Sequence, residues 1–364
     1  MIFIFACRVM KSRYAKFLGL FAIVYIALHL CVTVLNNGTV EDRRQITNPK
    51  ESDGPLIMRD LPKSEGNALK AKVQKIYKTD TDFLYITLIN KAYVNLTCNW
   101  LCNVEQFKSN VIGKTLIISL DSEVCDTIHK QWPNVNCLVF NITDEYNQPL
   151  NWGHQDYINI LTLRIQIMRI IMNTTFVLFE TDAAWLKDPS EFFKNQTLVD
   201  DADIIVPRKG YTDKGQTYTF DPMIVYPNQG SKSLIKAMET RLIADPKLYD
   251  QDLLDELCRT QYNGVVCRQF DWNDVADGKW FKLAESERRN IHPYIVNNNY
   301  YIGVTNKASR QALNGLWFLS PKGYCVKTKV ETMFRKYSTS DEKNVQKKSN
   351  KKNRQKRKNV KANS

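Results

Sequence analysis

Five short apolar runs, separated by longer helical or polar segments, constrain the fold of this chain more than any other feature. They are rich in β-branched and aromatic residues, as buried strands are, and cover residues 83–89, 115–121, 137–140, 176–180 and 202–206. Helix-like segments at 122–131 and 156–172 lie between them. Apolar strands that alternate with helices indicate a mostly parallel sheet covered on both faces. We therefore expect an α/β fold of the nucleotide-binding kind, in which ligands gather beyond the C-terminal ends of the strands.

A longer apolar run lies near the N-terminus, at residues 17–35. Its nineteen residues contain no formally charged side chain, and it is long enough to cross a bilayer as a helix. Four basic side chains precede it within residues 1–16. The positive-inside rule then places residues 1–16 in the cytosol and the remainder of the chain in the lumen. The alternative is a cleaved signal peptide, but the run exceeds the usual length of one and no small-residue cleavage site follows it closely. We predict a single-pass type II membrane protein with a transmembrane signal anchor.

Sequons and cysteines agree with a location in the secretory lumen. Five N-x-Ser/Thr sequons begin at residues 37, 95, 141, 173 and 195, and such sites are glycosylated only there. Seven cysteines follow the anchor, so at least one is a free thiol or pairs with another chain. Cys258 and Cys267 are the expected local disulfide. Cys98 and Cys102 have the spacing of a metal pair, but no matching His/Cys pair follows, which argues against zinc.

Composition divides the rest of the chain into three parts. Residues 36–79 are polar without sustained periodicity and are expected to form a lumenal stem, whereas residues 80–325 are expected to form the folded domain. Residues 326–364 are predicted to be a basic, disordered tail. Residues 338–364 alone carry a net +8 of the chain's +13, so the basicity belongs to a tail and not to a groove. Because that tail is expected to be lumenal, we expect no nucleic-acid partner.

Two carboxylates, Glu180 and Asp182, follow the fourth apolar run. Side chains at positions i and i+2 of an extended chain point the same way, so both could converge at the C-terminal edge of the sheet. Two carboxylates repel each other, which makes a cation the natural partner. Mn²⁺ and Mg²⁺ prefer oxygen ligands and often bridge to substrate phosphates. For an isolated pair, the alternative is that Asp182 caps a turn or helix while Glu180 faces solvent.

The helical segment 156–172 places Arg164 in the middle of an apolar stripe. One explanation is that its stem lies along the core while its head reaches water. The other is that Arg164 binds an anionic ligand at the edge of the sheet.

The residues around the acidic pair resemble a known family. Residues 180–189, with Trp185-Leu186 and Asp188-Pro189, are similar to the "DxD-x-x-W-L-x-D-P" signature of the nucleotide-diphospho-sugar transferase family, which includes plant xylosyl- and arabinosyltransferases and animal type II membrane proteins. The resemblance covers about residues 82–320. Its further motifs are an "NWLC" segment at 99–102, a "DQ" pair at 250–251, a "P-x-x-V-H-N-N"-like stretch at 293–299, Gly303, Lys307 and residues 315–317.

This resemblance implies a GT-A-like fold and a Golgi membrane enzyme whose catalytic domain is residues 80–325. It implies transfer of a sugar, with retention, from a nucleotide-diphosphate donor, expected to be UDP-linked, to a glycan or glycoprotein acceptor. Glu180 and Asp182 would hold Mn²⁺ or Mg²⁺ together with the ribose and diphosphate of the donor. The remaining roles that it implies are donor-phosphate contacts for Arg164 and Lys307, positioning of the reacting sugar by Asp250 and Gln251, and contacts on the diphosphate or acceptor side for Asn298 and Asn299.

Two positions depart from the family pattern. Glu180 stands where the family more often has Asp, and Asn297 stands where a His is expected as a third metal ligand. His292, five residues upstream, is an alternative ligand. Both departures concern the same ion. The alternative function is therefore a catalytically inactive lumenal sugar-binding protein that keeps the fold.

Overall fold

A computed structural model of the chain describes residues 61–77, 83–142, 146, 150, 153–194, 200–209, 218–288 and 290–337. Within this part of the chain, a seven-stranded sheet has the order β3-β2-β1-β4-β7-β6-β8. The predicted apolar runs form β1 (Leu84–Ile89), β2 (Thr115–Ser119), β3 (Asn136–Val139), β4 (Phe176–Leu178) and β6 (Ile204–Pro207). The remaining strands are β7 (Met223–Val225) and β8 (Cys267–Phe270).

All neighbouring strands pair in parallel except β7, which is antiparallel to both β4 and β6. The other six strands therefore run in one direction. This confirms the predicted α/β fold with a mostly parallel sheet. The reversed strand β7 was not predicted, and it places the N-terminal end of β7 beside the C-terminal end of β4.

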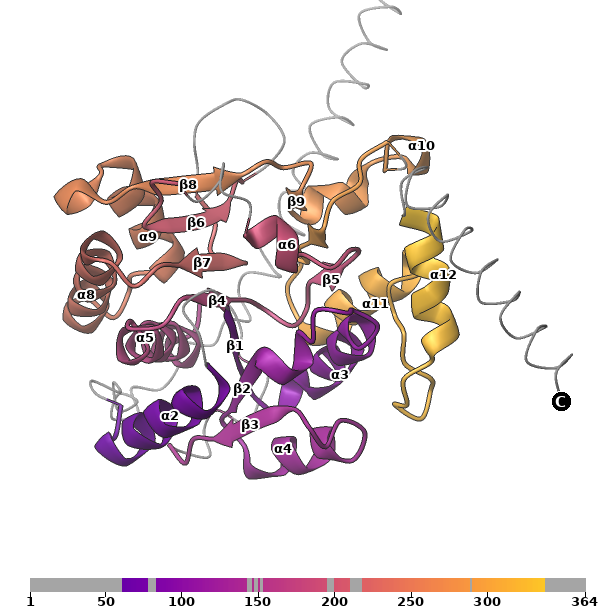
Figure 1. The fold of residues 1–364 in the computed structure, drawn as a ribbon, viewed down its shortest axis with the longest axis horizontal. Coiled ribbons are helices and arrows are strands. Elements are labelled where there is room, and N and C mark those ends of the chain that lie inside the picture. Colours follow the sequence, from indigo (N-terminus) through magenta and orange to yellow (C-terminus); the bar gives the residue numbers. More distant parts are fainter. Residues whose placement is uncertain are drawn as a thin grey trace, which may run out of the picture. The chain divides into compact units, whose positions relative to one another are not determined.

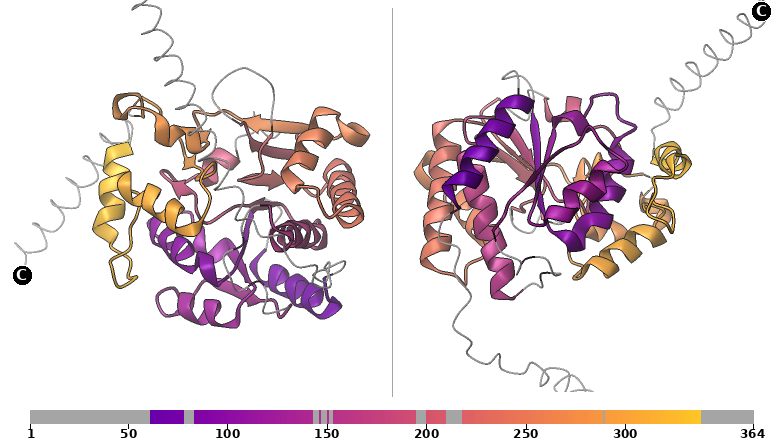
Figure 2. Two further views of the ribbon diagram at one scale, coloured as in Figure 1. Left: turned by 180° about the vertical axis from the view of Figure 1, so that it is seen from behind. Right: turned by 90° about the horizontal axis from the view of Figure 1, so that it is seen from below.

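Both faces of the sheet are covered by helices, because alternate residues of each buried strand point to opposite sides. Leu84 and Ile86 of β1 lie in one core with residues of α2 (Lys63–Ile76), α5 (Gln155–Ile170), α8 (Gln229–Ala244) and α9 (Asp250–Arg259). Tyr85 lies in the other core with residues of α3 (Val94–Val104), α4 (Ser122–His129) and α12 (Lys327–Tyr337). Figure 1 shows α2, α5 and α8 on one side of the strands and α3, α11 (Val304–Leu313) and α12 on the other, and Figure 2 shows the strands between these groups.

A second, three-stranded sheet has the order β5-β10-β9. Its strands are β5 (Ala184–Trp185), β9 (Val275–Ala276) and β10 (Ile295–Val296), and Ala184 pairs with Val296. Because β5 begins just after Asp182 and β10 ends just before Asn297, this sheet brings the acidic turn and the asparagine-rich segment together. The smaller helices are α6 (Ser190–Phe193) and α10 (Glu285–Arg288), with short 3-10 turns η1 (Lys91–Tyr93), η2 (Ile112–Lys114), η4 (Tyr262–Gly264) and η5 (Gly278–Lys282).

Two predicted boundaries need correction. Helix α2 lies within residues 36–79, which were expected to form a stem, and its Leu69 and Val73 are buried against the sheet. Helix α12 lies within residues 326–364, which were expected to be a disordered tail, and its Val330 and Met333 are buried. In both helices the few apolar residues are spaced to form one buried stripe, whereas the average composition is polar. Composition therefore underestimated the extent of the folded unit.

The cysteine predictions can be compared directly with three disulfides. Cys258 pairs with Cys267 as expected, and Cys125 pairs with Cys137. Cys102 pairs with Cys325, so it cannot form a metal pair with Cys98. Cys98 is a buried free thiol, and burial raises its pKa to about 11.

The predicted transmembrane run at 17–35 lies outside the described residues. Among the residues that the structure describes, no helix is long and apolar enough to span a bilayer.

Candidate active site

A cavity of about 580 Å³ opens where β4 ends and β7 begins. It gathers side chains from segments that are distant in the sequence. Every site residue predicted from the sequence lines it: Arg164, Glu180, Asp182, Asp250, Gln251, Asn297, Asn298, Asn299 and Lys307. His292, the alternative ligand, is not among its lining residues.

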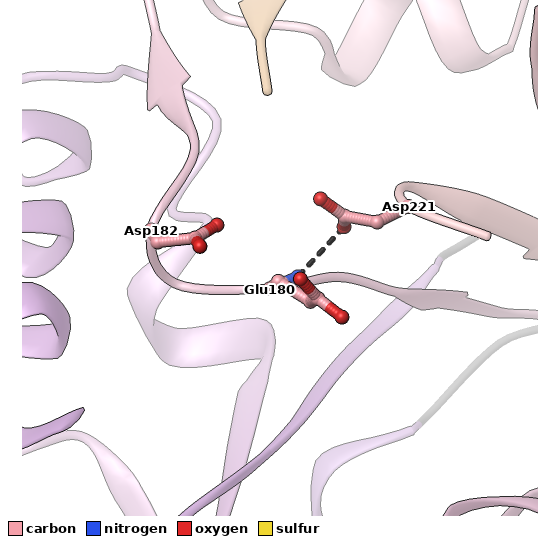
Figure 3. Close-up of side chains that lie close together, drawn as sticks. All are labelled: Glu180, Asp182 and Asp221. Atoms are coloured by element: carbon pink, nitrogen blue, oxygen red, sulfur yellow. Dashed lines mark hydrogen bonds between the residues drawn. The ribbon is translucent and has the colours of Figure 1, made fainter. Parts of the chain in front are cut away.

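Three carboxylates form an acidic cluster at the floor of this cavity. The predicted run 176–180 is a strand only as far as Leu178, so Glu180 and Asp182 follow β4. The main-chain N–H of Ala183 donates to the carbonyl of Glu180 at 3.3 Å, which closes a turn there. The third carboxylate belongs to Asp221. Ligand oxygens of Glu180, Asp182 and Asp221 all lie within 4.8 Å of one another, and Figure 3 shows the three side chains around one space.

Strand register explains why Asp221 joins the pair. Leu178 of β4 is opposite Met223 of β7 in an antiparallel ladder, so the residues two positions beyond each, Glu180 and Asp221, also face each other. The main-chain N–H of Glu180 donates to Oδ1 of Asp221 at 2.7 Å. Sequence reasoning missed Asp221, because an Asp-Pro pair before a short apolar run is equally typical of an ordinary turn. Only the antiparallel pairing of β7 would have revealed it.

The electrostatics of the cluster are those of crowded carboxylates, of which Asp182 is buried and Glu180 and Asp221 are partly exposed. Burial raises the pKa of Asp221 well above its ordinary value, and the negative charges of Glu180 and Asp182 raise it further. Burial likewise raises the pKa of Asp182. Burial also opposes ionisation of Glu180, but the positive charges of Arg164 and Lys307 outweigh it and lower that pKa. Ionisation of all three carboxylates therefore calls for more positive charge in the cavity.

Two cations supply part of that charge. Lys307 of α11 forms an ion pair with Asp182. Arg164 of α5 donates from Nη1 to Glu180 at 2.9 Å and from Nε to Asp250 at 3.0 Å, and its guanidinium lies 4.1 Å from the centroid of the Phe220 ring. Its side chain is only 12% exposed, which argues against the first of the two explanations given for this residue, that its head reaches water. Glu180, Asp182, Asp221 and Asp250 lie beside two cations, Arg164 and Lys307. When all of these groups are ionised, they carry an excess of two negative charges, which one divalent cation would balance.

Asn297 meets the acidic cluster from β10. Its Nδ2 donates to the main-chain carbonyl of Asp221. Its Oδ1 is buried and has no hydrogen-bond partner among the described residues, and only 2% of the residue is exposed. A buried amide oxygen without a partner is unfavourable unless a ligand satisfies it. Three carboxylates and one amide oxygen are a donor set that suits Mn²⁺ or Mg²⁺.

The two asparagines that follow make internal hydrogen bonds. Asn298 donates from Nδ2 to the main-chain carbonyl of Lys307 at 3.0 Å, and its Oδ1 accepts from Nε of Arg310 at 2.6 Å. Oδ1 of Asn299 accepts from the main-chain N–H of Gly278 at 2.5 Å. The two bonds of Asn298 hold α11, and with it Lys307, against the cavity. Contacts of Asn298 and Asn299 with a donor or acceptor remain predictions.

Asp250 and Gln251 occupy the first turn of α9, and both line the cavity. Asp250 is only 2% exposed. Burial raises its pKa, although the positive charge of Arg164 opposes that shift. The helix N-terminus favours a negative charge at this position, which helps to keep a buried carboxylate beside Arg164.

The "NWLC" segment of α3 anchors the C-terminal part of the site. Asn99 donates from Nδ2 to the Gln311 side chain at 3.1 Å and to the main-chain carbonyl of Leu316 at 3.0 Å, while its Oδ1 accepts from the N–H of Phe318 at 2.6 Å. Gln311 in turn donates to the main-chain carbonyl of Asp182 at 2.5 Å. One buried asparagine thus links helix α3 and helix α11 to the acidic turn.

A smaller chamber of about 120 Å³, the annex, adjoins the main cavity. The residues that line both spaces are Tyr93, Leu150, Tyr157, Leu161, Arg164, Glu180 and Lys307. The rest of its wall comes largely from apolar side chains at the ends of β1, β2 and β4 and in α5: Leu88, Ile89, Leu120, Ile160, Leu178 and Phe179. A charged cavity with an apolar annex can hold a ligand that is anionic in one part and planar and less polar in another.

Comparison with known families assigns this chain. The sequence profile of the nucleotide-diphospho-sugar transferase family matches residues 110–311, which is more than half of the chain and contains every residue of the acidic cluster. The chain belongs to this family. The resemblance stated from the sequence is therefore confirmed, and the family is one of glycosyltransferases.

One relative is the arabinosyltransferase XEG113 of Arabidopsis thaliana. It is 19% identical to this chain over 269 residues, which is 66% of this chain and 41% of the relative. The match therefore spans less than half of the relative's length.

Two solved structures show limited similarity. The galactosyltransferase LgtC in complex with donor and acceptor sugar analogues has a TM-score of 0.43 and 10% identity, over 65% of this chain and 97% of that one. The glycosyltransferase GlyE of Streptococcus pneumoniae has a TM-score of 0.44 and 11% identity, over 70% of this chain and 64% of that one.

Proposed function

We propose that this protein transfers a sugar from a nucleotide-diphosphate donor, expected to be UDP-linked, to a glycan or glycoprotein acceptor, with a divalent metal ion and with retention of anomeric configuration. The observation that carries the proposal is the cavity itself. Nine residues chosen from the sequence line one space around a cluster of three carboxylates, within the segment that matches the family. Retention follows from the family resemblance alone.

The metal site is proposed to consist of Glu180, Asp182 and Asp221, with Oδ1 of Asn297 as a fourth oxygen ligand. When bound, Mn²⁺ or Mg²⁺ neutralises charge on the diphosphate leaving group. The substitution of Asn for the expected His is offset by Asp221, a carboxylate that the family pattern did not lead us to expect. This third carboxylate favours the enzyme over the alternative of an inactive sugar-binding protein.

The donor is proposed to lie across the cavity and its annex. Nζ of Lys307 and the guanidinium of Arg164 are the cationic groups beside the acidic cluster, and each can donate hydrogen bonds to phosphate oxygens as well as to carboxylates. The apolar annex suits the nucleobase. Asp250 and Gln251 are proposed to lie beside the reacting sugar, where the buried carboxylate of Asp250 can stabilise positive charge that develops at the anomeric carbon.

The proposed location is the Golgi membrane, with the folded domain in the lumen. Support comes from the uncharged run at 17–35, the five sequons and the three disulfides. Disulfides persist in oxidising compartments and are rare in the cytosol.

A donor screen tests the function. The purified full chain is incubated with a panel of nucleotide sugars, with Mn²⁺ or with chelator, and release of the nucleoside diphosphate is measured. We expect turnover of at least one donor, loss of that turnover in chelator, and loss in Asp182→Asn but not in Asp126→Asn, an exposed carboxylate on α4. Release of no nucleotide from any donor by a folded chain would favour the sugar-binding alternative.

A further inference from the structure

Three consecutive apolar side chains are exposed at the cavity: Tyr300, Tyr301 and Ile302, which are 44%, 46% and 64% exposed. All three line the cavity, and they directly follow the asparagine-rich segment. The other large apolar side chains that are exposed in the described part of the chain, Tyr262, Leu313 and Tyr324, do not line it. Exposed apolar groups gathered at a polar cavity mark a binding surface.

The ring of Tyr301 is held from one side. The guanidinium of Arg310 lies 4.4 Å from its centroid, and the same guanidinium lies 4.5 Å from the centroid of the Phe281 ring. Arg310 is fixed in turn by hydrogen bonds to Oδ1 of Asn298 at 2.6 Å and to the main-chain carbonyl of Asn299 at 2.8 Å. Because Arg310 covers one face, the exposed part of the Tyr301 ring is its opposite face and its edges.

Tyr300 is fixed independently. Its hydroxyl donates to Oδ2 of the buried Asp277 at 2.8 Å. Its φ of 62° lies in the left-handed region, which a bulky residue seldom adopts. Such backbone strain persists where the surrounding structure enforces it and is concentrated at functional sites. The segment therefore presents two aromatic rings whose positions are set before any ligand arrives.

We propose that Tyr301 is a stacking platform for the acceptor carbohydrate. A sugar ring combines an apolar face of C–H groups with hydroxyl groups around its edge, so it requires an exposed ring beside polar side chains. The cavity offers this combination, because Gln251 and Asp252 also line it. The apolar annex gives the donor's base a more enclosed place. The proposal rests on the proposed function, since it names the acceptor side of the same site.

A fixed ring lowers the entropic cost of binding, because fewer rotamers are lost when the ligand arrives. This suits a weakly bound acceptor, which must dissociate after each transfer. A second copy of the chain is a less suitable occupant, because three side chains beside a charged cavity are far smaller than a stable protein interface.

Binding of simple sugars tests the platform without requiring turnover. Methyl glycosides of glucose, galactose, mannose, xylose and arabinose are added to the full chain, and saturation-transfer NMR measures their binding. We expect at least one to bind through its ring C–H protons, Tyr301→Ala to weaken that binding about five- to tenfold, and Tyr301→Phe to retain it. Tyr324→Ala, which removes an exposed ring away from the cavity, is the matched control, and thermal unfolding verifies that each variant is folded.

Four results would overturn the platform. These are no binding of any glycoside, equal binding by the wild type and Tyr301→Ala, a loss of UDP affinity equal to the loss of sugar affinity, or a change of oligomeric state in Tyr301→Ala. The third would assign the ring to the nucleotide and the fourth to a second copy. Failure of the proposed function is distinct, because it shows as absent turnover of nucleotide sugars while sugar binding still depends on Tyr301.

Discussion

At the scale of single residues, the proposal that Asp221 is a metal ligand can be tested directly. We predict that Asp221→Asn weakens Mn²⁺ binding at least about tenfold, because even the partners of metal ligands commonly contribute that much. In chelator, the same variant should unfold at an unchanged or higher temperature. The amide can still accept from the N–H of Glu180, and a charge that Glu180 and Asp182 repel is gone.

Electron paramagnetic resonance of free Mn²⁺ measures the affinity, and differential scanning calorimetry measures the unfolding temperature. Asp126→Asn is the control for loss of one carboxylate from an exposed position. If Asp182→Asn loses the ion while Asp221→Asn binds it as the wild type does, then Asp221 is not a ligand and the ion relies on the other oxygens.

A second prediction at this scale concerns how much Arg164 contributes to stability. It pairs with one buried carboxylate, Asp250, and one half-exposed carboxylate, Glu180. The side chain of Asp250 is 2% exposed, whereas that of Glu180 is 43% exposed. We predict that Arg164→Met lowers the free energy of unfolding by about 3–5 kcal/mol, because it leaves Asp250 buried without its charged partner. Asp250→Asn in the same chain should restore part of that loss.

Urea unfolding of the wild type, both single variants and the double variant gives the coupling energy, which we expect to be about 1–3 kcal/mol. Additive effects would show that Arg164 stabilises the fold through its contacts with Phe220 and Glu180 and not through Asp250. In the double variant the apparent donor KM should still be raised, because the phosphate contact proposed for Arg164 is missing.

At the scale of elements, the sequence predicted those parts of the fold whose signal is local. β1, β2, β3, β4 and β6 are continuous apolar runs, and α5 is a long helix, so periodicity and composition are sufficient to find them. β7 is only three residues long, and its antiparallel pairing depends on β4 and β6. Asp221 was missed for this reason. Glu180, Asp182 and Arg164 stood out from the local pattern of residues. The remaining site residues were found through the family resemblance, and spacing alone would not have assembled them.

Helices α2 and α12 were not predicted, because composition alone does not reveal a polar helix that packs on the fold. Both are polar on average, and each is held by a few apolar contacts. For α12 a covalent link adds to them, because Cys325 lies two residues before the helix and pairs with Cys102 of α3. The link joins two segments that also share the hydrogen bonds of Asn99.

Two of the disulfides close loops of very different length, so they allow a test of how much loop closure contributes to stability. Cys102 and Cys325 are separated by 223 residues, and Cys258 and Cys267 by 9. In the chain-entropy description these loops correspond to about 5 and about 3 kcal/mol. We predict that the Cys102→Ala/Cys325→Ala double variant loses more free energy of unfolding than Cys258→Ala/Cys267→Ala does, as measured by guanidinium unfolding.

The Cys102→Ala/Cys325→Ala variant should also lose more donor turnover than the Cys258→Ala/Cys267→Ala variant does. The Cys102–Cys325 disulfide joins α3 to the segment that follows α11, the helix that carries Lys307. The Cys258–Cys267 disulfide closes only a turn between α9 and β8. Equal destabilisation by the two double variants would show that packing of α12, and not loop closure, holds the C-terminal segment.

At the scale of the whole molecule, topology can be tested through sequons that the folded domain displays. Asn95, Asn141 and Asn173 are all exposed, whereas Asn37 and Asn195 lie outside the described residues. Asn173 is next to packed segments, yet its side chain is accessible. If residues 17–35 anchor the chain with its folded domain in the lumen, the oligosaccharyltransferase can reach all three of these sites.

We predict that the chain made in a eukaryotic secretory host carries N-glycans at Asn95, Asn141 and Asn173. Digestion with peptide N-glycosidase F should shift its electrophoretic mobility, and each Asn→Gln variant should remove one step of that shift. Deletion of residues 1–35 is the control for entry into the lumen and should remove all steps. A full-length chain without glycans in such a host would place the folded domain in the cytosol. The three disulfides would then need another explanation, because cytosolic thiols are kept reduced.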